Sequence, residues 1–148
     1  MNKFLEMFKD KKVMHITDSD TDGVMCCILG EMFIEPLCSV FLPYMNNDRS
    51  FTDIELQNVD MSDVILFTDI APDLNLLDYI RRHSSEKIIV ICDHHDTSYE
   101  ILKNENIKHY YYTSDFCGTK IFFDKLSEGT RPKKIIKDVV DLVDTYDC

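Results

Sequence analysis

The fold of this chain is decided by residues 88–95, Ile-Ile-Val-Ile-Cys-Asp-His-His. A short apolar, β-branched run that ends in polar residues is typical of a buried strand in a parallel sheet. Two other runs repeat the pattern, because residues 13–17 lead into Asp-Ser-Asp-Thr-Asp-Gly at 18–23 and residues 64–68 lead into Asp69. In open parallel sheets, ligands bind just beyond the carboxyl ends of the strands. We therefore expect these carboxylates and imidazoles to meet in one small volume.

Carboxylates held this close together repel one another unless cations lie among them. The central hypothesis is therefore a two-metal site that hydrolyses phosphate esters. Asp93-His94-His95 is the most specific signal, because adjacent imidazoles at a strand end point in different directions. One ring can bind a metal while the other faces the substrate, and Asp93 is placed to fix the tautomer of a ring. The competing interpretation is that both histidines are merely exposed.

Strand-like and helix-like segments alternate along the chain, which predicts a doubly wound α/β fold. We expect a mainly parallel five-stranded sheet with helices on both faces. The predicted strands are residues 13–17, 37–44, 64–68, 88–92 and 107–112, and Pro43 places the second of them at an edge. The predicted helices are residues 1–10, 24–34, 51–58, 72–83, 99–104, 119–126 and 133–146, with a polar loop at 46–50.

At 148 residues the chain is long enough for one domain with a hydrophobic core. Its 16 basic and 27 acidic residues give a net charge of −11, which argues against sequence-independent binding of duplex DNA. We see no membrane span and no signal peptide in the sequence. The six cysteines include no C-x-x-C pair, which is typical of reduced thiols. We therefore expect a cytoplasmic protein that has no contact with a membrane.

Residues 18–23 admit three other interpretations. They open like an EF-hand calcium loop, but position 12 of that loop would be Leu29 instead of glutamate, and a strand precedes them instead of a helix. They also resemble the Asp-x-Asp-x-Thr/Val segment of haloacid-dehalogenase-type phosphatases, although Asp22 stands at the fifth position. Finally, an aspartate here can cap the following helix. One cap needs one carboxylate, whereas three stand at alternate positions, which favours metal binding.

Other candidate residues keep two interpretations each. Asp69 is either a helix cap or a carboxylate that bridges two metals. Asp144 and Asp147 share a helical face, and they either reach the site or are solvated. Cys117-Gly118-Thr119 marks either an ordinary helix start or backbone N–H groups that a substrate phosphate approaches closely. His15, inside the first strand, is predicted to be a packed core residue.

These motifs together resemble the DHH phosphoesterase superfamily, which takes its name from the Asp-His-His found here at 93–95. Residues 18–23, Asp69, residues 93–95 and the terminal aspartates occur in the family order, and the match covers essentially the whole chain. The spacing and the Cys-Gly-Thr at 117–119 are similar to nanoRNases, which are oligoribonucleases. Asp18, where many members have histidine, is similar to RecJ-type exonucleases. The resemblance implies a single DHH catalytic domain.

The resemblance also implies how these motifs together form one metal centre. A water activated by two divalent ions would attack the phosphate, and an acidic ligand set favours Mn²⁺, with Mg²⁺ as the alternative. The resemblance implies that Asp18 and Asp20 hold one ion, that Asp69 bridges both ions, and that the other ion is held by Asp22, His94 and either Asp147 or its rival Asp144. It also implies that His95 contacts the scissile phosphate. Asp93 would support the histidines without binding a metal.

Members of the superfamily usually continue into a smaller substrate-binding domain, whereas this chain ends at Cys148 after the fourth motif. We therefore expect either a catalytic fragment or a minimal form with an open groove. Its substrate would be a short single-stranded oligonucleotide or a small nucleotide. Its protein partner would be either a separate C-terminal domain or a second copy of the chain. The tyrosines at 110–112 can stack bases. Because the side chains of a strand alternate between its faces, we expect at least one of them in the core.

Three functions compete at this point. The first is a metal-dependent phosphodiesterase that hydrolyses short oligonucleotides. The second is a phosphatase or pyrophosphatase acting on small metabolites. The third is a non-catalytic module, either receiver-like or nucleotide-sequestering. A receiver domain needs neither His94 nor His95, so the imidazoles favour an enzyme.

Overall fold

Five parallel strands form a single sheet in the order β2-β1-β3-β4-β5. The computed structural model describes residues 2–42, 51–83 and 86–147, and the predicted loop at 46–50 lies outside them. The strands are β1 (Val13–Thr17), β2 (Cys38–Phe41), β3 (Val64–Thr68), β4 (Ile88–Asp93) and β5 (His109–Tyr112). The prediction of a doubly wound α/β fold is confirmed, and β2 lies at an edge as expected.

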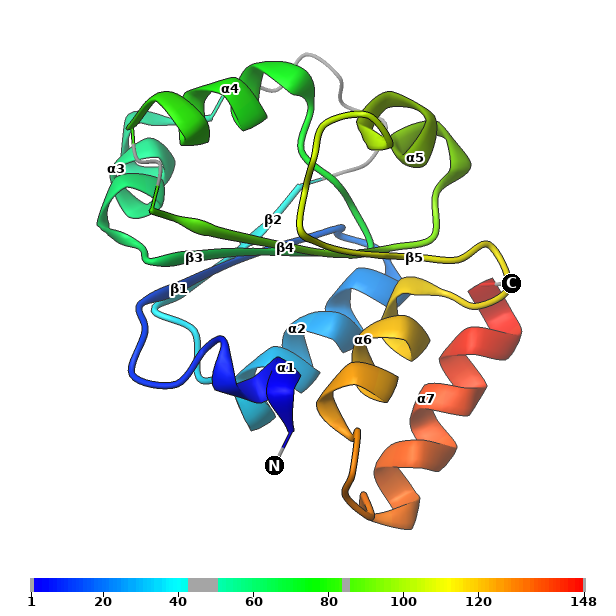
Figure 1. Cartoon of the computed structure of the whole chain (residues 1–148). Coiled ribbons are helices and arrows are strands. Elements are labelled where there is room, and N and C mark those ends of the chain that lie inside the picture. Colours follow the sequence, from blue (N-terminus) through cyan, green and yellow to red (C-terminus); the bar gives the residue numbers. More distant parts are fainter. Residues whose placement is uncertain (1, 43–50, 84–85, 148) are drawn as a thin grey trace.

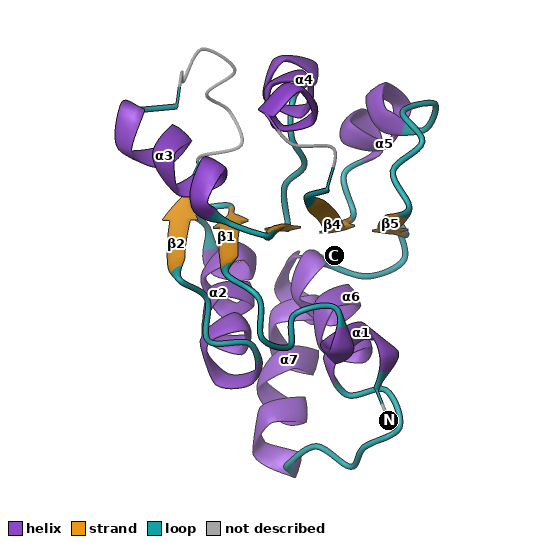
Figure 2. Cartoon of the chain, turned by 60° about the vertical axis from the view of Figure 1, so that its left-hand side comes forward, coloured by secondary structure: helices purple, strands orange, loops and turns teal. Residues whose placement is uncertain are grey.

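Helices cover both faces of the sheet (Figure 1). One layer contains α3 (Asp53–Met61), α4 (Leu74–His83) and α5 (Asp96–Leu102); the other contains α1 (Lys3–Glu6), α2 (Thr21–Phe33), α6 (Gly118–Leu126) and α7 (Lys134–Asp147). Figure 2 shows the sheet between these two layers. The residue before α3, Thr52, forms a capping box with Glu55, so this helix start follows from the local sequence.

The central strands are apolar on both faces because each face is covered by helices. Leu66 packs in the core beneath α2 and α6, whereas Phe67 packs in the opposite core with Leu77 and Ile80 of α4. All five residues of β1 and of β3 are buried. The uninterrupted apolar runs of the sequence therefore have a direct cause in two-sided burial.

The strand register aligns the polar residues that follow the strands. Thr17 pairs with Thr68, and Thr68 pairs with Cys92, so Asp18, Asp69 and Asp93 stand side by side at the carboxyl edge. In this strand order the connection after β1 leads to one edge of the sheet, and the connection after β3 leads to the other. Open sheets of this kind bind ligands at the point between two such strands. The fold thus places two aspartates at its switch point.

The predicted helix at 99–104 is wrong in its start, because α5 already begins at Asp96, directly after His95. Its first turn contains Asp96, a carboxylate that favours a helix N-terminus. The cysteines among the described residues are free thiols, as expected. No helix of the described part of the chain has the length and apolar character that crossing a membrane requires.

His15 is fully buried in β1, which confirms the prediction of a core residue. The Thr17 hydroxyl donates to the carbonyl of Gly23 and accepts from Thr68, so Thr68 in turn accepts from Nε2 of His15, 2.7 Å away. Nδ1 has no hydrogen-bond partner among the described residues. Burial therefore lowers the pKa of His15 to about 3, because a second ring proton would have no acceptor.

In the metal-free protein we expect the contribution of His15 to stability to be lost as the pH falls below 6.5, while the raised pKa of Asp69 gives a contribution of the opposite sign. His15 stays neutral in the folded state but takes up a proton when unfolded, which amounts to about 2 kcal/mol between pH 6.5 and 5. Urea unfolding in the presence of a chelator measures this free energy. Between pH 6.5 and 5, His15→Gln should gain about 2 kcal/mol of stability relative to wild type, whereas the exposed His83→Gln should show no such relative change. Equal slopes for wild type and His15→Gln would contradict the assignment.

Candidate metal centre

Asp69 lies at the centre of the polar cluster, immediately after β3. Its backbone has φ 57°, in the left-handed region that few residues other than glycine adopt. The side chain is 1% exposed, and neither carboxylate oxygen accepts a hydrogen bond from a described residue. A strained backbone and an unsatisfied buried carboxylate are both costly, and such features gather at functional sites.

His94 faces three carboxylates from three other parts of the chain. Its Nε2 atom lies 3.2 Å from Oδ1 of Asp69, 3.4 Å from Oδ2 of Asp147 and 3.8 Å from Oδ2 of Asp22. One imidazole nitrogen surrounded by oxygens at these distances matches the mixed ligand set of divalent transition metals. The tertiary structure thus brings together residues that are up to 125 positions apart in sequence.

Three overlapping groups of side chains are arranged so that each can hold a metal ion. Within each group, one ligand atom per residue lies within 4.8 Å of the others. Asp69 belongs to two of the groups, and so does His94. The groups are Asp18, Asp20 and Asp69; Asp69, His94 and His95; and Asp22, His94 and Asp147.

The charges of this cluster favour a cation. Burial, together with the negative charges of Asp22 and Asp20, raises the pKa of Asp69 to about 12. Burial and the same two aspartates also raise the pKa of Asp147, although His94 and His95 act against this. A divalent ion would remove the repulsion and satisfy the free oxygens of Asp69, so the residues present fit a hard metal ion.

Asp22 is held in place by the start of α6. Its Oδ2 and Oδ1 atoms accept hydrogen bonds of 2.7 Å from the backbone N–H groups of Gly118 and Thr119. One of the two interpretations left open by the sequence gave these N–H groups to a substrate phosphate, but in the structure both donate to Asp22. The helix N-terminus orients a fully buried carboxylate instead.

Asp93 supports both histidines. Its Oδ1 atom accepts from the backbone N–H of His94 at 2.9 Å and lies 2.8 Å from Nδ1 of His95. Burial acts to lower the pKa of His95, but the hydrogen bond to Asp93 and the charges of Asp93, Asp18 and Asp147 outweigh it and raise the pKa. Asp93 thereby fixes the orientation of the His95 ring.

The geometry agrees with comparisons to known proteins. The sequence matches the DHH family, N-terminal domain, over residues 12–145. The chain belongs to the DHH family. Comparison with curated protein sequences gave no significant match.

Two solved structures share the fold of this DHH domain. An uncharacterized protein from Helicobacter pylori G27 is 22% identical, with a TM-score of 0.73 over 92% of this chain and 43% of its own. An exonuclease RecJ bound to manganese is 13% identical, with a TM-score of 0.65 over 97% of this chain and 41% of its own. The DHH chain thus spans less than half the length of these two proteins.

Of the two rivals for the fourth DHH motif, the structure brings Asp147 to His94. Asp144 lies one helical turn earlier, and its Oδ1 atom accepts the backbone N–H of Cys117 at 2.8 Å. Asp144 therefore ties α7 to the start of α6, and this tie helps to place Asp147. Only the relative position of α6 and α7 distinguishes the two aspartates, which the sequence spacing left open.

The sequence analysis missed two features of this DHH site. The first is the support of Asp22 by α6, for which the small pair Gly118-Thr119 was the available signal. The second is a contact between β5 and α5, in which the hydroxyl of Tyr112 donates to Asp96. The alternation of tyrosines along residues 110–112 indicated that Tyr112 shares a sheet face with Tyr110, but nothing in the sequence indicated the contact with α5.

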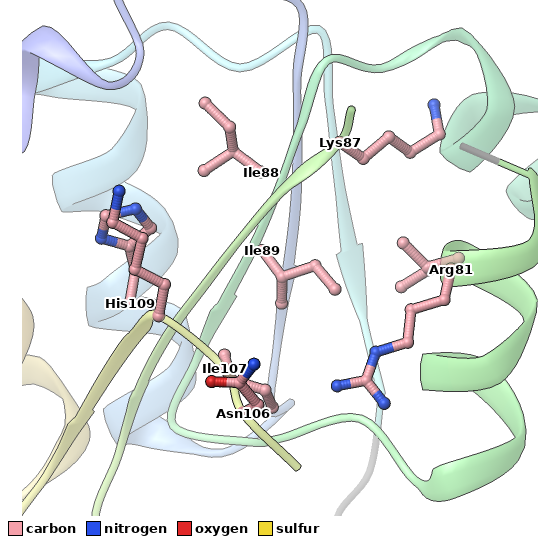
Figure 3. A pocket seen from close by; sticks show the side chains of 9 residues that line it. Arg81, Lys87, Ile88, Ile89, Asn106, Ile107 and His109 are labelled. Atoms are coloured by element: carbon pink, nitrogen blue, oxygen red, sulfur yellow. The ribbon is translucent and has the colours of Figure 1, made fainter. Parts of the chain in front are cut away.

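A cavity of about 530 Å³ lies elsewhere in the DHH domain (Figure 3). It is lined by the apolar Ile88, Ile89 and Ile107 together with Arg81, Lys87 and His109. These residues stand where β4 and β5 begin, at the end of the sheet opposite to Asp93. The cavity is therefore separate from the metal centre.

Proposed function

We propose that this DHH-family chain is a metal-dependent phosphodiesterase that hydrolyses short oligonucleotides or small nucleotides with two divalent ions. The observation that carries the proposal is the shared position of Asp69, a buried carboxylate with both oxygens free, in two adjoining ligand groups. A carboxylate that bridges two ions is a recurring feature of two-metal phosphoesterases. Bound ions would activate water and offset the charge that develops on the phosphoryl group.

Different residues of the chain would hold the two ions. Asp18 and Asp20 form one ligand group with Asp69, and Asp22 and Asp147 form another with His94, so the cluster offers ligands for two ions. The oxygen-rich ligands favour Mn²⁺ or Mg²⁺, and Mn²⁺ gains support from the RecJ exonuclease of similar fold, which is described as bound to manganese.

His95 is the candidate contact to the scissile phosphate. It belongs to one of the ligand groups, with Asp69 and His94, and Asp93 fixes its ring. In its protonated form, the ring held by Asp93 donates a hydrogen bond to a phosphate oxygen. Substrate binding would therefore combine the metal centre with one oriented imidazole.

Purified protein with Mn²⁺ tests the proposal against its alternatives. The substrates are a dinucleotide, a cyclic dinucleotide, inorganic pyrophosphate and a phosphate monoester. Cleavage of a phosphodiester supports the proposal, whereas cleavage of only pyrophosphate or the monoester supports a small-molecule phosphatase. Hydrolysis of none, with the metal bound and with a C-terminal DHH-family domain supplied in trans, supports a nucleotide-sequestering role.

We expect His95→Ala to retain the metal ions but to lower kcat by about a hundredfold, because it removes a single hydrogen-bonding group from the transition state. Metal content by elemental analysis and steady-state kinetics measure the two effects. His109→Ala, at the other end of the sheet, is the matched control. Unchanged turnover in His95→Ala would remove the role assigned to this ring.

A further inference from the structure

A second cavity lies between α5 and β5, and it has aromatic walls. Its volume is about 340 Å³, which is within the range of small-molecule sites. Tyr99 of α5 and Tyr110 and Tyr112 of β5 line it, together with Lys103 and Asn106. We call this cavity the tyrosine pocket. All three tyrosines are only half-buried, so the rings remain accessible.

The rings already form a stack. Tyr99 and Tyr112 lie face to face with centroids 4.1 Å apart and planes 11° apart, and Tyr110 meets the Tyr112 ring edge-on at 6.4 Å. Rings in this arrangement present a flat, rigid surface with polar tips. Aromatic side chains of this kind stack nucleobases in proteins that bind single strands.

The tyrosine pocket is next to the metal centre. Tyr112 pairs in register with Asp93, the residue before His94, and its hydroxyl donates to Asp96, the residue after His95. Because strand residues alternate between faces, Tyr110 and Tyr112 share one side of β5. A nucleotide whose phosphate lies at the metal centre therefore has the Tyr112 end of the pocket within reach of its base.

One of the residues that line the pocket carries an unsatisfied polar group. The hydroxyl of Tyr110 is buried and has no hydrogen-bond partner among the described residues. Burial, followed by the charge of Asp93, raises the pKa of this hydroxyl, so it stays protonated and remains a donor. A buried donor without an acceptor is costly, but this oxygen is closed to solvent, so the rings and not the hydroxyl carry the contact with a ligand.

The simpler interpretation is that these tyrosines only pack α5 against an edge strand. For packing α5 against the sheet, Leu102 of this helix is sufficient, because it is buried in the core and only 1% exposed. Such packing does not account for a cavity along the rings. We propose that the tyrosine pocket binds a nucleobase of the substrate, which makes this DHH domain selective for nucleotides over base-free phosphate compounds. This inference rests on the proposed phosphodiesterase function.

The test compares an adenine dinucleotide with the same dinucleotide carrying abasic sugars, both with Mn²⁺. We expect Tyr99→Leu to raise KM for the dinucleotide by about tenfold to a hundredfold, the usual range for loss of one stacking ring. Its kinetics on the abasic substrate should stay within about twofold of wild type. Tyr99→Phe keeps the ring and should keep the wild-type KM.

Tyr79→Leu is the matched control. Tyr79 also stacks on a ring, that of His83 at 4.0 Å, and its hydroxyl donates to a carboxylate, that of Asp60, but it lies on α4 outside the pocket. Its substitution should leave both substrates unaffected. A Tyr99→Leu protein whose KM changes equally for both substrates, or for neither, overturns the inference.

Failure of the proposed function gives a different result, because wild-type protein would then cleave neither dinucleotide. In that case, a binding experiment tests the inference. Adenosine 5′-monophosphate and ribose 5-phosphate are titrated into protein labelled with 3-fluorotyrosine, and the tyrosine signals are assigned by substitution. Shifts of Tyr99, Tyr110 and Tyr112 with the nucleotide alone support the pocket. Absence of such shifts, or equal shifts with both compounds, refutes it.

Discussion

Asp69→Asn is expected to abolish stoichiometric metal binding and to lower phosphodiesterase turnover by at least about a thousandfold. The asparagine keeps the size of the side chain but removes the charge that both ligand groups share. Loss of one peripheral ligand, such as Asp18, would affect one ion, whereas loss of the shared carboxylate affects both. Elemental analysis after gel filtration and calorimetric titration with Mn²⁺ measure the stoichiometry.

The same substitution should stabilise the metal-free protein. Asp69 is buried among other carboxylates, so a neutral isostere removes repulsion and retains the packing. The expected rise in Tm is at least about 2 °C, which corresponds to about 1 kcal/mol in a domain of this size. Opposite effects on stability and metal binding distinguish a functional carboxylate from a structural one.

Asp63→Asn is the matched control, since Asp63 precedes the same strand at its other end, where its carboxylate accepts the backbone N–H of Lys12. This variant should bind metal normally and gain no stability. If Asp69→Asn retained two manganese ions per chain, the bridging role would be refuted.

Gly23→Ala is expected to cost on the order of 3 kcal/mol or more, although alanine is the better helix former. A Cβ atom at this position would lie 2.1 Å from the carbonyl oxygen of Asp18, a contact that no rotamer change can relieve because both partners are backbone. Alanine's helix propensity gains only about 1 kcal/mol, so the clash dominates. The start of α2 must then move away from the end of β1.

This displacement also disturbs the metal centre, because Asp18, Asp20 and Asp22 flank the close contact. Residual folded Gly23→Ala protein should therefore bind Mn²⁺ at least about tenfold more weakly. Thr21→Ala, an exposed position in the same turn, should change neither stability nor metal affinity. Urea unfolding and metal titration check both effects, and wild-type behaviour of Gly23→Ala would show that the turn tolerates a side chain.

Most of the fold could be predicted because its strands are buried on both faces. Two-sided burial produces apolar runs such as residues 64–68, and polar residues such as Asp69 then mark where each strand ends. The ends of short helices were less certain. The start of α5 at Asp96 depends on how the chain leaves β4, and local propensity near Tyr99 gave no sign of it.

The sequence by itself determined the parallel α/β class and the set of acidic and imidazole residues at the strand ends, because strand burial and residue chemistry are local properties. The tertiary structure alone placed Asp147 instead of Asp144 beside His94, paired the N–H groups of Gly118 and Thr119 with Asp22, and stacked Tyr99 on Tyr112 of β5. Each of these outcomes depends on the packing of elements that are distant in sequence. Distances across such contacts are set by the whole core, and no periodicity in a single segment encodes them.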